Sequence, residues 1–224
     1  MSKDEMNKTL TVFFSLVIFI CFFLIIKDLL EYSMADREYE QLNNMISDEV
    51  TTKAAPEDDT AAPGKPKAKT RSDFDRLYEI NNDLVCILSI PDLGLRYPVV
   101  RGRDNSVYLT KTFEGNKNPA GCLFIDYENS PDITDNNTFI YGHNMKNGSM
   151  FGSLKKLTYD DFDSSSTKAY VTTEKGTGEY SLKDTRVVDI NEYKAPMDEE
   201  GLLTLYTCWG NDKDRRLLVT FSRT

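Results

Sequence analysis

The sequence predicts an all-β domain with a few short helices, placed behind an N-terminal membrane-spanning helix. The C-terminal two thirds of the chain carries short apolar segments that are rich in β-branched residues and separated by turn-forming residues. An uncharged run of seventeen residues, Leu10 to Ile26, lies near the N-terminus. Between the two, residues 51–72 are rich in alanine, proline and charge.

The apolar run is just long enough to cross the ~30 Å hydrocarbon core of a bilayer. A cleaved signal peptide is the alternative, with a weak small-residue cleavage site at Ser33-Met34-Ala35. The run exceeds the usual apolar region of a signal peptide, which has about 7–15 residues. We therefore expect an uncleaved signal anchor over residues 10–27, after a polar segment of residues 1–9. The flanking charges do not decide which side the C-terminal domain faces.

Residues 28–72 are expected to connect the anchor to the folded domain. Asp28 to Val50 is charged with spaced apolar residues, which is compatible with a helical juxtamembrane stalk. Residues 51–72 contain three prolines and neither an aromatic nor a β-branched aliphatic residue. Such a segment cannot bury enough apolar surface to offset its ordering entropy, which predicts a flexible spacer.

The folded domain is expected over residues 73–224. Ser72 followed by Asp75 resembles a helix-capping box and predicts a short opening helix. Further short helices are expected at Ser106–Leu109 and Met150–Leu157. The many short strands and their turns indicate a barrel or a sandwich. The expected strands are Leu84–Ile90, Tyr97–Val100, Cys122–Asp126, Thr138–Tyr141, Ala169–Thr173, Tyr180–Ile190, Leu203–Cys208 and Leu217–Phe221.

Three side chains could form a cysteine acyl-transfer site. Cys208 ends the strand that begins at Leu203 and points away from its leucines, and Arg216 lies on the next strand. His143, the only histidine of the chain, follows the expected strand that ends at Tyr141. A cysteine nucleophile needs a base or a cation to lower its thiol pKa from about 8.5, and an oxyanion needs a donor or positive charge nearby.

Plainer interpretations of the same residues stay open. Cys208 could be a buried structural thiol, and His143 and Arg216 could be ordinary polar residues. Cys86 and Cys122 could pair, although both lie in apolar segments that suit buried free thiols. With one histidine and no C-x-x-C pair we expect no metal or other cofactor. The formal net charge of −9 argues against nucleic acid as a partner.

Several segments resemble the sortases, the membrane-anchored cysteine transpeptidases of Gram-positive bacteria. Thr204-Leu205-Tyr206-Thr207-Cys208 is similar to their TLxTC signature. Tyr141 to Phe151 (YGHNMKNGSMF) closely matches the segment around the catalytic histidine of class B members. The class B resemblance also covers Asn81–Ile87, Ile90-Pro91, Tyr97–Val100, Asp104-Asn105, Tyr108-Leu109 and Ala120–Asp126.

The resemblance implies an eight-stranded sortase-type β-barrel and a role for each site residue. Cys208 would attack the carbonyl of a threonine in a sorting motif, and His143 would act as acid and base. Arg216, which fits the family pattern better than Arg215, would hold the substrate and its oxyanion. Asn105 and Leu109 match positions near the substrate groove. Tyr206 and Thr207 of the signature are likewise expected at the substrate.

The resemblance also implies partners and a location. The substrates would be secreted proteins with a C-terminal sorting signal, and the acceptor an amine of the peptidoglycan cross-bridge. The protein would lie in the cell membrane as a single-pass protein, its N-terminus in the cytosol and its catalytic domain outside. Two alternatives stay open. One is a pilin-polymerising sortase that uses a pilin lysine, and the other is an inactive membrane-tethered binding module.

The chain departs from the class B pattern in three places. Only Asn191 to Gly201 separates the last two expected strands before Cys208, where class B members usually insert a long helix. Cys86 stands where they usually carry tryptophan, and Tyr206 replaces a small residue. The sorting motif therefore cannot be carried over from the family.

Overall fold

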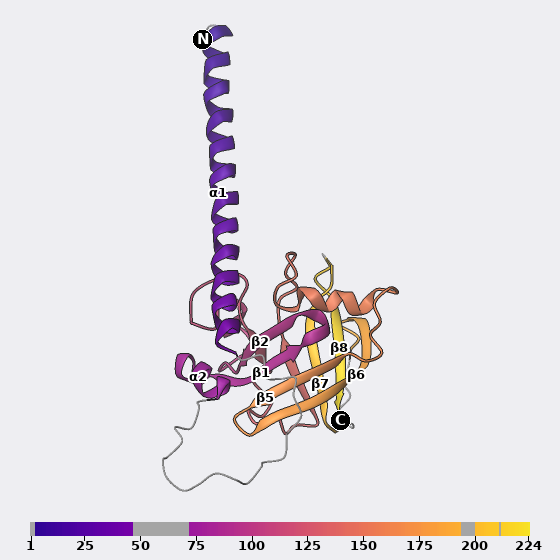
Figure 1. Cartoon of the computed structure of the whole chain (residues 1–224). Helices are drawn as coiled ribbons and strands as arrows, with labels where there is room; N and C mark the ends of the chain where they lie inside the picture. Colours follow the sequence, from indigo (N-terminus) through magenta and orange to yellow (C-terminus); the bar gives the residue numbers. More distant parts are fainter. Residues whose placement is uncertain (1–2, 47–71, 194–199, 211) are drawn as a thin grey trace, which may run out of the picture.

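The computed structural model describes residues 3–46, 72–193, 200–210 and 212–224. Eight strands close into a barrel in the spatial order β1-β2-β3-β4-β7-β8-β6-β5 (Figure 1). The strand pattern of the sequence was compatible with a barrel or a sandwich. The closed barrel that the family resemblance implied is confirmed. The strands are β1 (Leu84–Ile90), β2 (Leu95–Val100), β3 (Leu123–Ile125), β4 (Asn137–Tyr141), β5 (Lys168–Thr173), β6 (Gly176–Asp189), β7 (Leu202–Cys208) and β8 (Arg215–Arg223).

The side chains of β7 alternate between the barrel interior and its outer face. Leu203 and Leu205 belong to the buried core, together with inward residues of the neighbouring strands. Tyr206 and Cys208 lie on the other face, where Tyr206 is half-buried and Cys208 is exposed. This period of two is what the leucine spacing predicts for a strand with one face in a core.

Two strand pairs of the barrel are parallel. They are β2 with β3 and β4 with β7, whereas the six other neighbouring pairs are antiparallel. The chain leaves β4, builds β5 and β6 elsewhere in the barrel, and returns as β7 beside β4. The C-terminal ends of β4 and β7 therefore lie at the same edge of the barrel.

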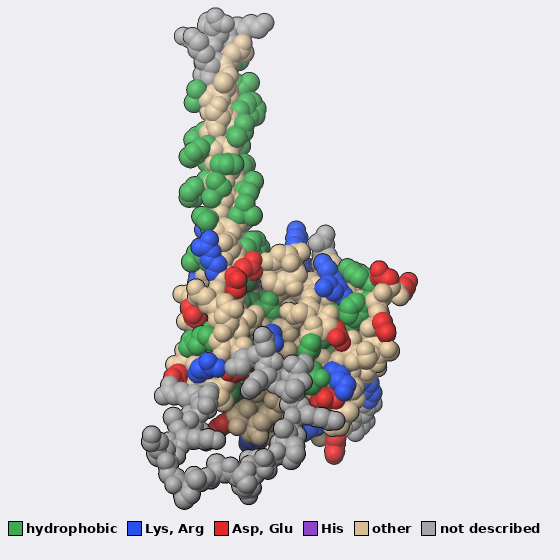
Figure 2. Space-filling model, in the orientation of Figure 1, with side chains coloured by type: hydrophobic (Ala, Val, Ile, Leu, Met, Phe, Trp, Pro, Cys, Tyr) green, Lys and Arg blue, Asp and Glu red, His purple; other side chains and the backbone are tan. Residues whose placement is uncertain are grey.

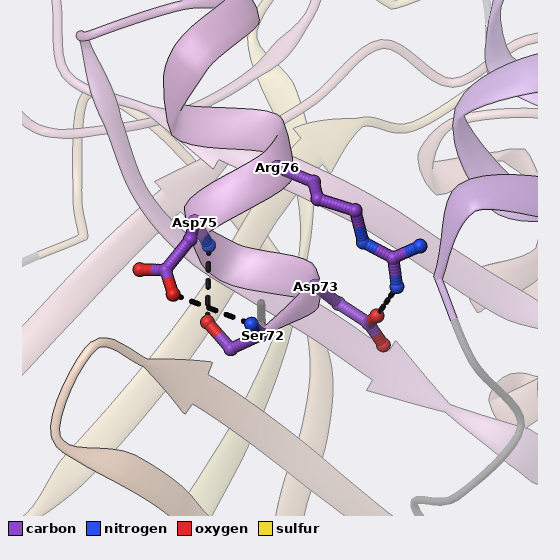
Figure 3. A network of polar contacts seen from close by, with 4 residues as sticks. All are labelled: Ser72, Asp73, Asp75 and Arg76. Carbon is purple, nitrogen blue, oxygen red and sulfur yellow. Dashed lines mark hydrogen bonds and ion pairs between the residues drawn. The ribbon is translucent and has the colours of Figure 1, made fainter. Parts of the chain in front are cut away.

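Short helices occupy the predicted places. The helix α2 (Asp73–Ile80) begins at a complete capping box (Figure 3), in which Asp75 N donates to Ser72 Oγ and Ser72 N donates to the Asp75 carboxylate. Arg76 also pairs with Asp73 on this helix. The 3-10 helices are η2 (Pro91–Leu93), η3 (Val107–Leu109) and η4 (Phe151–Thr158).

The N-terminal helix α1 (Lys3–Met45) rises away from the barrel as one long rod (Figure 1). From Leu10 onward it is long and apolar enough to cross a membrane, judged by length and composition, and its most apolar stretch packs against nothing. Hydrophobic side chains surround this part of the helix (Figure 2). A helix that is apolar all round suits lipid surroundings, since no single face needs a protein partner.

The last part of α1 docks on the barrel domain. Ala35, Tyr39, Leu42 and Ile46 are each at most 5% exposed and belong to the buried core. Their spacing of three to four residues puts them on one helix face. The segment expected as a stalk is thus helical up to Met45 and forms part of the folded body. The expected spacer lies outside the described residues except for Ser72.

Prediction for the core. Leu205→Ala should lower the free energy of unfolding by about 2–5 kcal/mol, because the Leu205 side chain is fully buried and its loss leaves a cavity. Ile190→Ala, at a side chain 37% exposed, is the matched control and should cost less than about 1 kcal/mol. Denaturant unfolding followed by circular dichroism measures both changes. Equal losses would contradict the packing described for β7.

Candidate active site

The parallel pairing of β4 with β7 brings His143 and Cys208 to one edge of the barrel. Tyr141 of β4 is the register partner of Tyr206 of β7. Gly142 N extends the pairing by donating to Tyr206 O at 3.2 Å. His143 and Cys208 each follow two residues after this register pair. The sequence alone could not show this, because 65 positions separate them and the adjacency depends on the strand order.

Tight packing holds the chain where it leaves β4. A β-carbon on Gly142 would lie 2.3 Å from Leu123 Cδ2 and 2.7 Å from Phe151 Cδ2, so only glycine fits without a shift of its neighbours. Thr207 Oγ1 donates to Gly142 O at 2.7 Å. Phe151 N donates to His143 O at 3.0 Å and closes the loop of residues 143–151, which we call the histidine loop.

The imidazole of His143 is oriented by a backbone carbonyl. Its Nε2 lies 2.7 Å from the carbonyl oxygen of Leu109, at the end of η3. A carbonyl can only accept, so Nε2 must carry the hydrogen. In the neutral ring Nδ1 is then the nitrogen with a free lone pair. Nδ1 is thus the ring nitrogen that can accept a proton.

Cys208 is the exposed thiol of the barrel. Its carbonyl oxygen accepts a hydrogen bond of 2.9 Å from Asn144 Nδ2, which ties the end of β7 to the histidine loop. Cys86 and Cys122 are buried free thiols. Burial raises the pKa of Cys122 to about 12 and raises that of Cys86 as well. Both stay protonated near neutral pH and are unsuited to nucleophilic attack.

Arg216 lies directly opposite Cys208. The two residues are register partners in the antiparallel β7–β8 pair, and such partners project on the same face with Cβ atoms about 4.5–5.5 Å apart. Arg216 Nη1 donates to Lys213 O at 2.6 Å and to Arg215 O at 3.0 Å. Its guanidinium carbon lies 5.9 Å from the ring centroid of Tyr206. Arg215, the other candidate, is one position away on β8 and therefore projects on the opposite face of the strand, where its register partner is Asp189 of β6.

A groove of about 800 Å³ lies against β4 and the segment that precedes it, with Tyr206 of β7 in its lining. The rings of Tyr141 and Tyr206 meet edge to face with centroids 5.1 Å apart. Tyr141 OH donates to Asp126 Oδ2 at 2.7 Å. Burial, and next the hydrogen bond to Asp126, raises the pKa of Tyr141. Burial also raises the pKa of Tyr206, against the opposing charge of Arg216.

The four residues expected at the substrate lie in different surroundings. Tyr206 lines the groove. Asn105 donates to Asp126 Oδ2, at 3.1 Å, so it borders the groove through that carboxylate. The Leu109 side chain is 40% exposed, and the backbone carbonyl of the same residue binds the imidazole. Thr207 is buried behind the site, and its hydroxyl is engaged by Gly142. Substrate contacts by these residues stay predictions.

Sequence reasoning gave no role to Asn144, Gly142 or Asp126, although they support the site. Asn144 and Gly142 flank the histidine within the segment that resembles class B sortases, and this resemblance could have pointed to them. Asp126 closes the expected third strand, and nothing in its sequence surroundings predicts its bond to Tyr141. Within the described residues no group of three His, Cys, Asp or Glu side chains could hold a metal ion.

The fold is that of a known family. The profile of the sortase domain matches residues 88–224, more than half of the chain. The chain belongs to the sortase family.

The relatives narrow the resemblance to class B. The chain is 40% identical over 102 residues to sortase B of Listeria monocytogenes and 32% identical over 98 residues to sortase B of Staphylococcus aureus. These matches cover 46% and 44% of this chain but only 42% and 40% of the relatives. The crystal structure of sortase B from B. anthracis in complex with AAEK1 superposes with a TM-score of 0.68 at 24% identity, over 88% of this chain and 99% of that chain.

Prediction for the thiols. Iodoacetamide at neutral pH should modify Cys208 of the native chain much faster than Cys86 or Cys122, because Cys208 is exposed and the other two are buried with raised pKa values. Peptide mapping by mass spectrometry measures the rate at each position. After denaturation the three rates should converge. Preferential labelling of Cys122 in the native chain would contradict the site.

Proposed function

We propose that this chain is a class B-like sortase, a cysteine transpeptidase that cleaves a sorting motif after threonine and joins the threonine to an amine. The observation that carries the proposal is the position of His143 and Cys208 at matching ends of parallel β4 and β7, with Arg216 opposite Cys208. Membership of the sortase family and the likeness to two sortase B proteins support it.

In the first half-reaction the Cys208 thiolate adds to the threonine carbonyl carbon. A C–S bond forms, and the carbonyl oxygen takes the negative charge. Arg216, which shares the face of Cys208, supplies positive charge to this oxyanion. The imidazolium of His143 gives its Nδ1 proton to the departing amine. The C–N bond breaks, leaving a thioester on Cys208 and neutral His143.

In the second half-reaction an amine attacks the thioester. Neutral His143 takes a proton from that amine at Nδ1 as the new C–N bond forms. The C–S bond breaks, and the thiolate of Cys208 returns with the imidazolium. The hydrogen bond from Nε2 to Leu109 O keeps the ring in one orientation through both steps, so that Nδ1 can serve as acid and then as base.

The groove beside Tyr206 supports an extended peptide as the substrate. Tyr206, which lines it, lies two residues before Cys208 on the same face of β7, so a segment bound beside Tyr206 would lead its threonine toward Cys208. Asp126, Glu128 and Asp135 line it. Peptide libraries for this chain should therefore include motifs with a lysine before the threonine.

The natural partners that we propose are secreted proteins with a C-terminal sorting signal and the amine of a peptidoglycan cross-bridge. The apolar part of α1 supports a single-pass anchor in the cell membrane, with the barrel on the outer side where such an acceptor lies. A pilin lysine is the alternative acceptor amine. The exposure of Cys208 and its Arg216 neighbour argue against an inactive binding module.

Prediction for the nucleophile and the acid-base. Cys208→Ala and His143→Ala should each lower peptide cleavage by roughly 10³-fold or more, because each removes a group that bonds to or exchanges a proton with the substrate. The assay incubates the full chain in detergent with threonine-containing pentapeptides and an amine, and product masses identify the bond cut. Unchanged circular dichroism serves as the folding control. Full activity in either variant would rule out this mechanism.

Prediction for the cation. Arg216→Ala should lower kcat by about 10²–10³-fold, the usual loss when one oxyanion-stabilising group is removed. Arg215→Ala is the matched control, since it removes the same charge one position away, and it should leave kcat nearly unchanged. Steady-state kinetics with the same peptide measures both. A larger loss in the Arg215 variant would assign the role to that residue instead.

A further inference from the structure

We propose that Tyr39, on the docked part of α1, is a positioning residue for the imidazole of His143. The proposal rests on the proposed function in so far as His143 is the acid and base. It assigns to the membrane-anchoring helix a part in the chemistry, because Tyr39 contacts both segments that hold the imidazole in place.

The first contact leads to the carbonyl that binds the imidazole. Tyr39 is 5% exposed, and its hydroxyl donates to Gly121 O at 2.6 Å. Gly121 has a φ of +61°, and a β-carbon there would lie 2.5 Å from Tyr108 O and 2.8 Å from Leu109 O. The Gly121 backbone thus packs directly against the carbonyl that accepts His143 Nε2. Displacing Gly121 displaces the partner of the imidazole.

The second contact leads to the loop that carries the histidine. The Tyr39 ring packs edge to face on Tyr97, with centroids 5.3 Å apart. The Tyr97 hydroxyl accepts a hydrogen bond of 3.1 Å from Met150 N. Met150 closes the histidine loop by a bridge to Asn144. Tyr39 therefore contacts Gly121, which packs against the carbonyl that binds the imidazole, and also Tyr97, which binds the loop that carries His143.

Neighbouring residues of α1 hold the same two segments. The Glu38 carboxylate, on a side chain that is almost fully buried, accepts from Glu114 N at 2.9 Å and from Asn116 Nδ2 at 3.1 Å. Asn147 of the histidine loop donates to the Asp36 carboxylate at 3.1 Å. The barrel itself closes without α1. The polar contacts of the helix are concentrated on the loops beside the site, which an anchor alone would not require.

The experiment uses the full-length chain in detergent micelles and compares Tyr39→Phe with Tyr32→Phe. Both changes remove one hydroxyl from α1 and keep the ring. Tyr32 is 40% exposed and serves as the matched control. Because His143 is the only histidine, ¹⁵N-histidine labelling gives one pair of imidazole nitrogen signals, whose shifts report which nitrogen carries the proton. Peptide cleavage gives kcat and KM, and thermal unfolding gives stability.

Tyr39→Phe should reduce the Nε2-protonated tautomer and lower kcat roughly 3-fold to 10-fold with KM nearly unchanged, because the loss of one supporting hydrogen bond lets the imidazole leave its orientation. Tyr32→Phe should match the parent chain in every readout. If Tyr39→Phe does not fold, Glu38→Gln, which loosens the same loop, takes its place with the same expected results.

A Tyr39→Phe chain with unchanged tautomer and unchanged kcat would overturn the proposal, even if its melting temperature fell, because the contact would then be structural only. If no variant and not even the parent cleaves peptides, but the tautomer still shifts in Tyr39→Phe alone, the positioning role stands and the proposed function fails. The two failures are therefore distinguishable.

Discussion

The parallel pairing of β4 with β7 is the constraint on which the rest of this structure depends. Two parallel strands end at the same edge of a sheet, so residues that follow their matched positions lie close to one another. Antiparallel β8 then adds the residue opposite Cys208. The thiol and the guanidinium thus come from adjacent strands of one sheet, and the imidazole comes from the loop that directly follows a third, neighbouring strand. A rigid sheet holds reacting groups with less uncertainty than mobile loops would.

The sequence predicted much of the barrel because its strands obey local rules. Leucines that alternate along β7, turn residues at Pro91 to Gly94 and the capping box at Ser72 each act over a few positions, and all are present in the structure. The capping box and the expected short helices are confirmed in place. Closure into a barrel, in contrast, came from the family resemblance, because strand order depends on contacts between residues far apart in the chain.

The sequence predicted the three main side chains of the candidate site, His143, Cys208 and Arg216. It did not predict the residues that hold them in place. The single histidine and the signature around Cys208 pointed to the groups that we propose to react. The carbonyl of Leu109 could not be predicted to orient the imidazole, since backbone acceptors have no sequence signature. Tyr39 lies in a segment expected as a stalk. Its helical spacing with Ala35 and Leu42 was visible, but only the folded barrel supplies the surface that these residues cover.

The helix α1 is continuous from its apolar N-terminal part to the part that docks on the barrel. The helix is already seated on the barrel at Ile46, before the segment 47–71 begins, and α2 starts beyond that segment on the same body. The described residues on either side of that segment therefore belong to one folded body. In the membrane-anchored protein that we propose, the docked helix would set the distance between the barrel and the bilayer. The C-terminal end of β7, which carries Cys208, lies at the barrel end toward which α1 rises (Figure 1). In the membrane-anchored protein that we propose, the thiol would therefore stand on the side of the barrel nearer the bilayer.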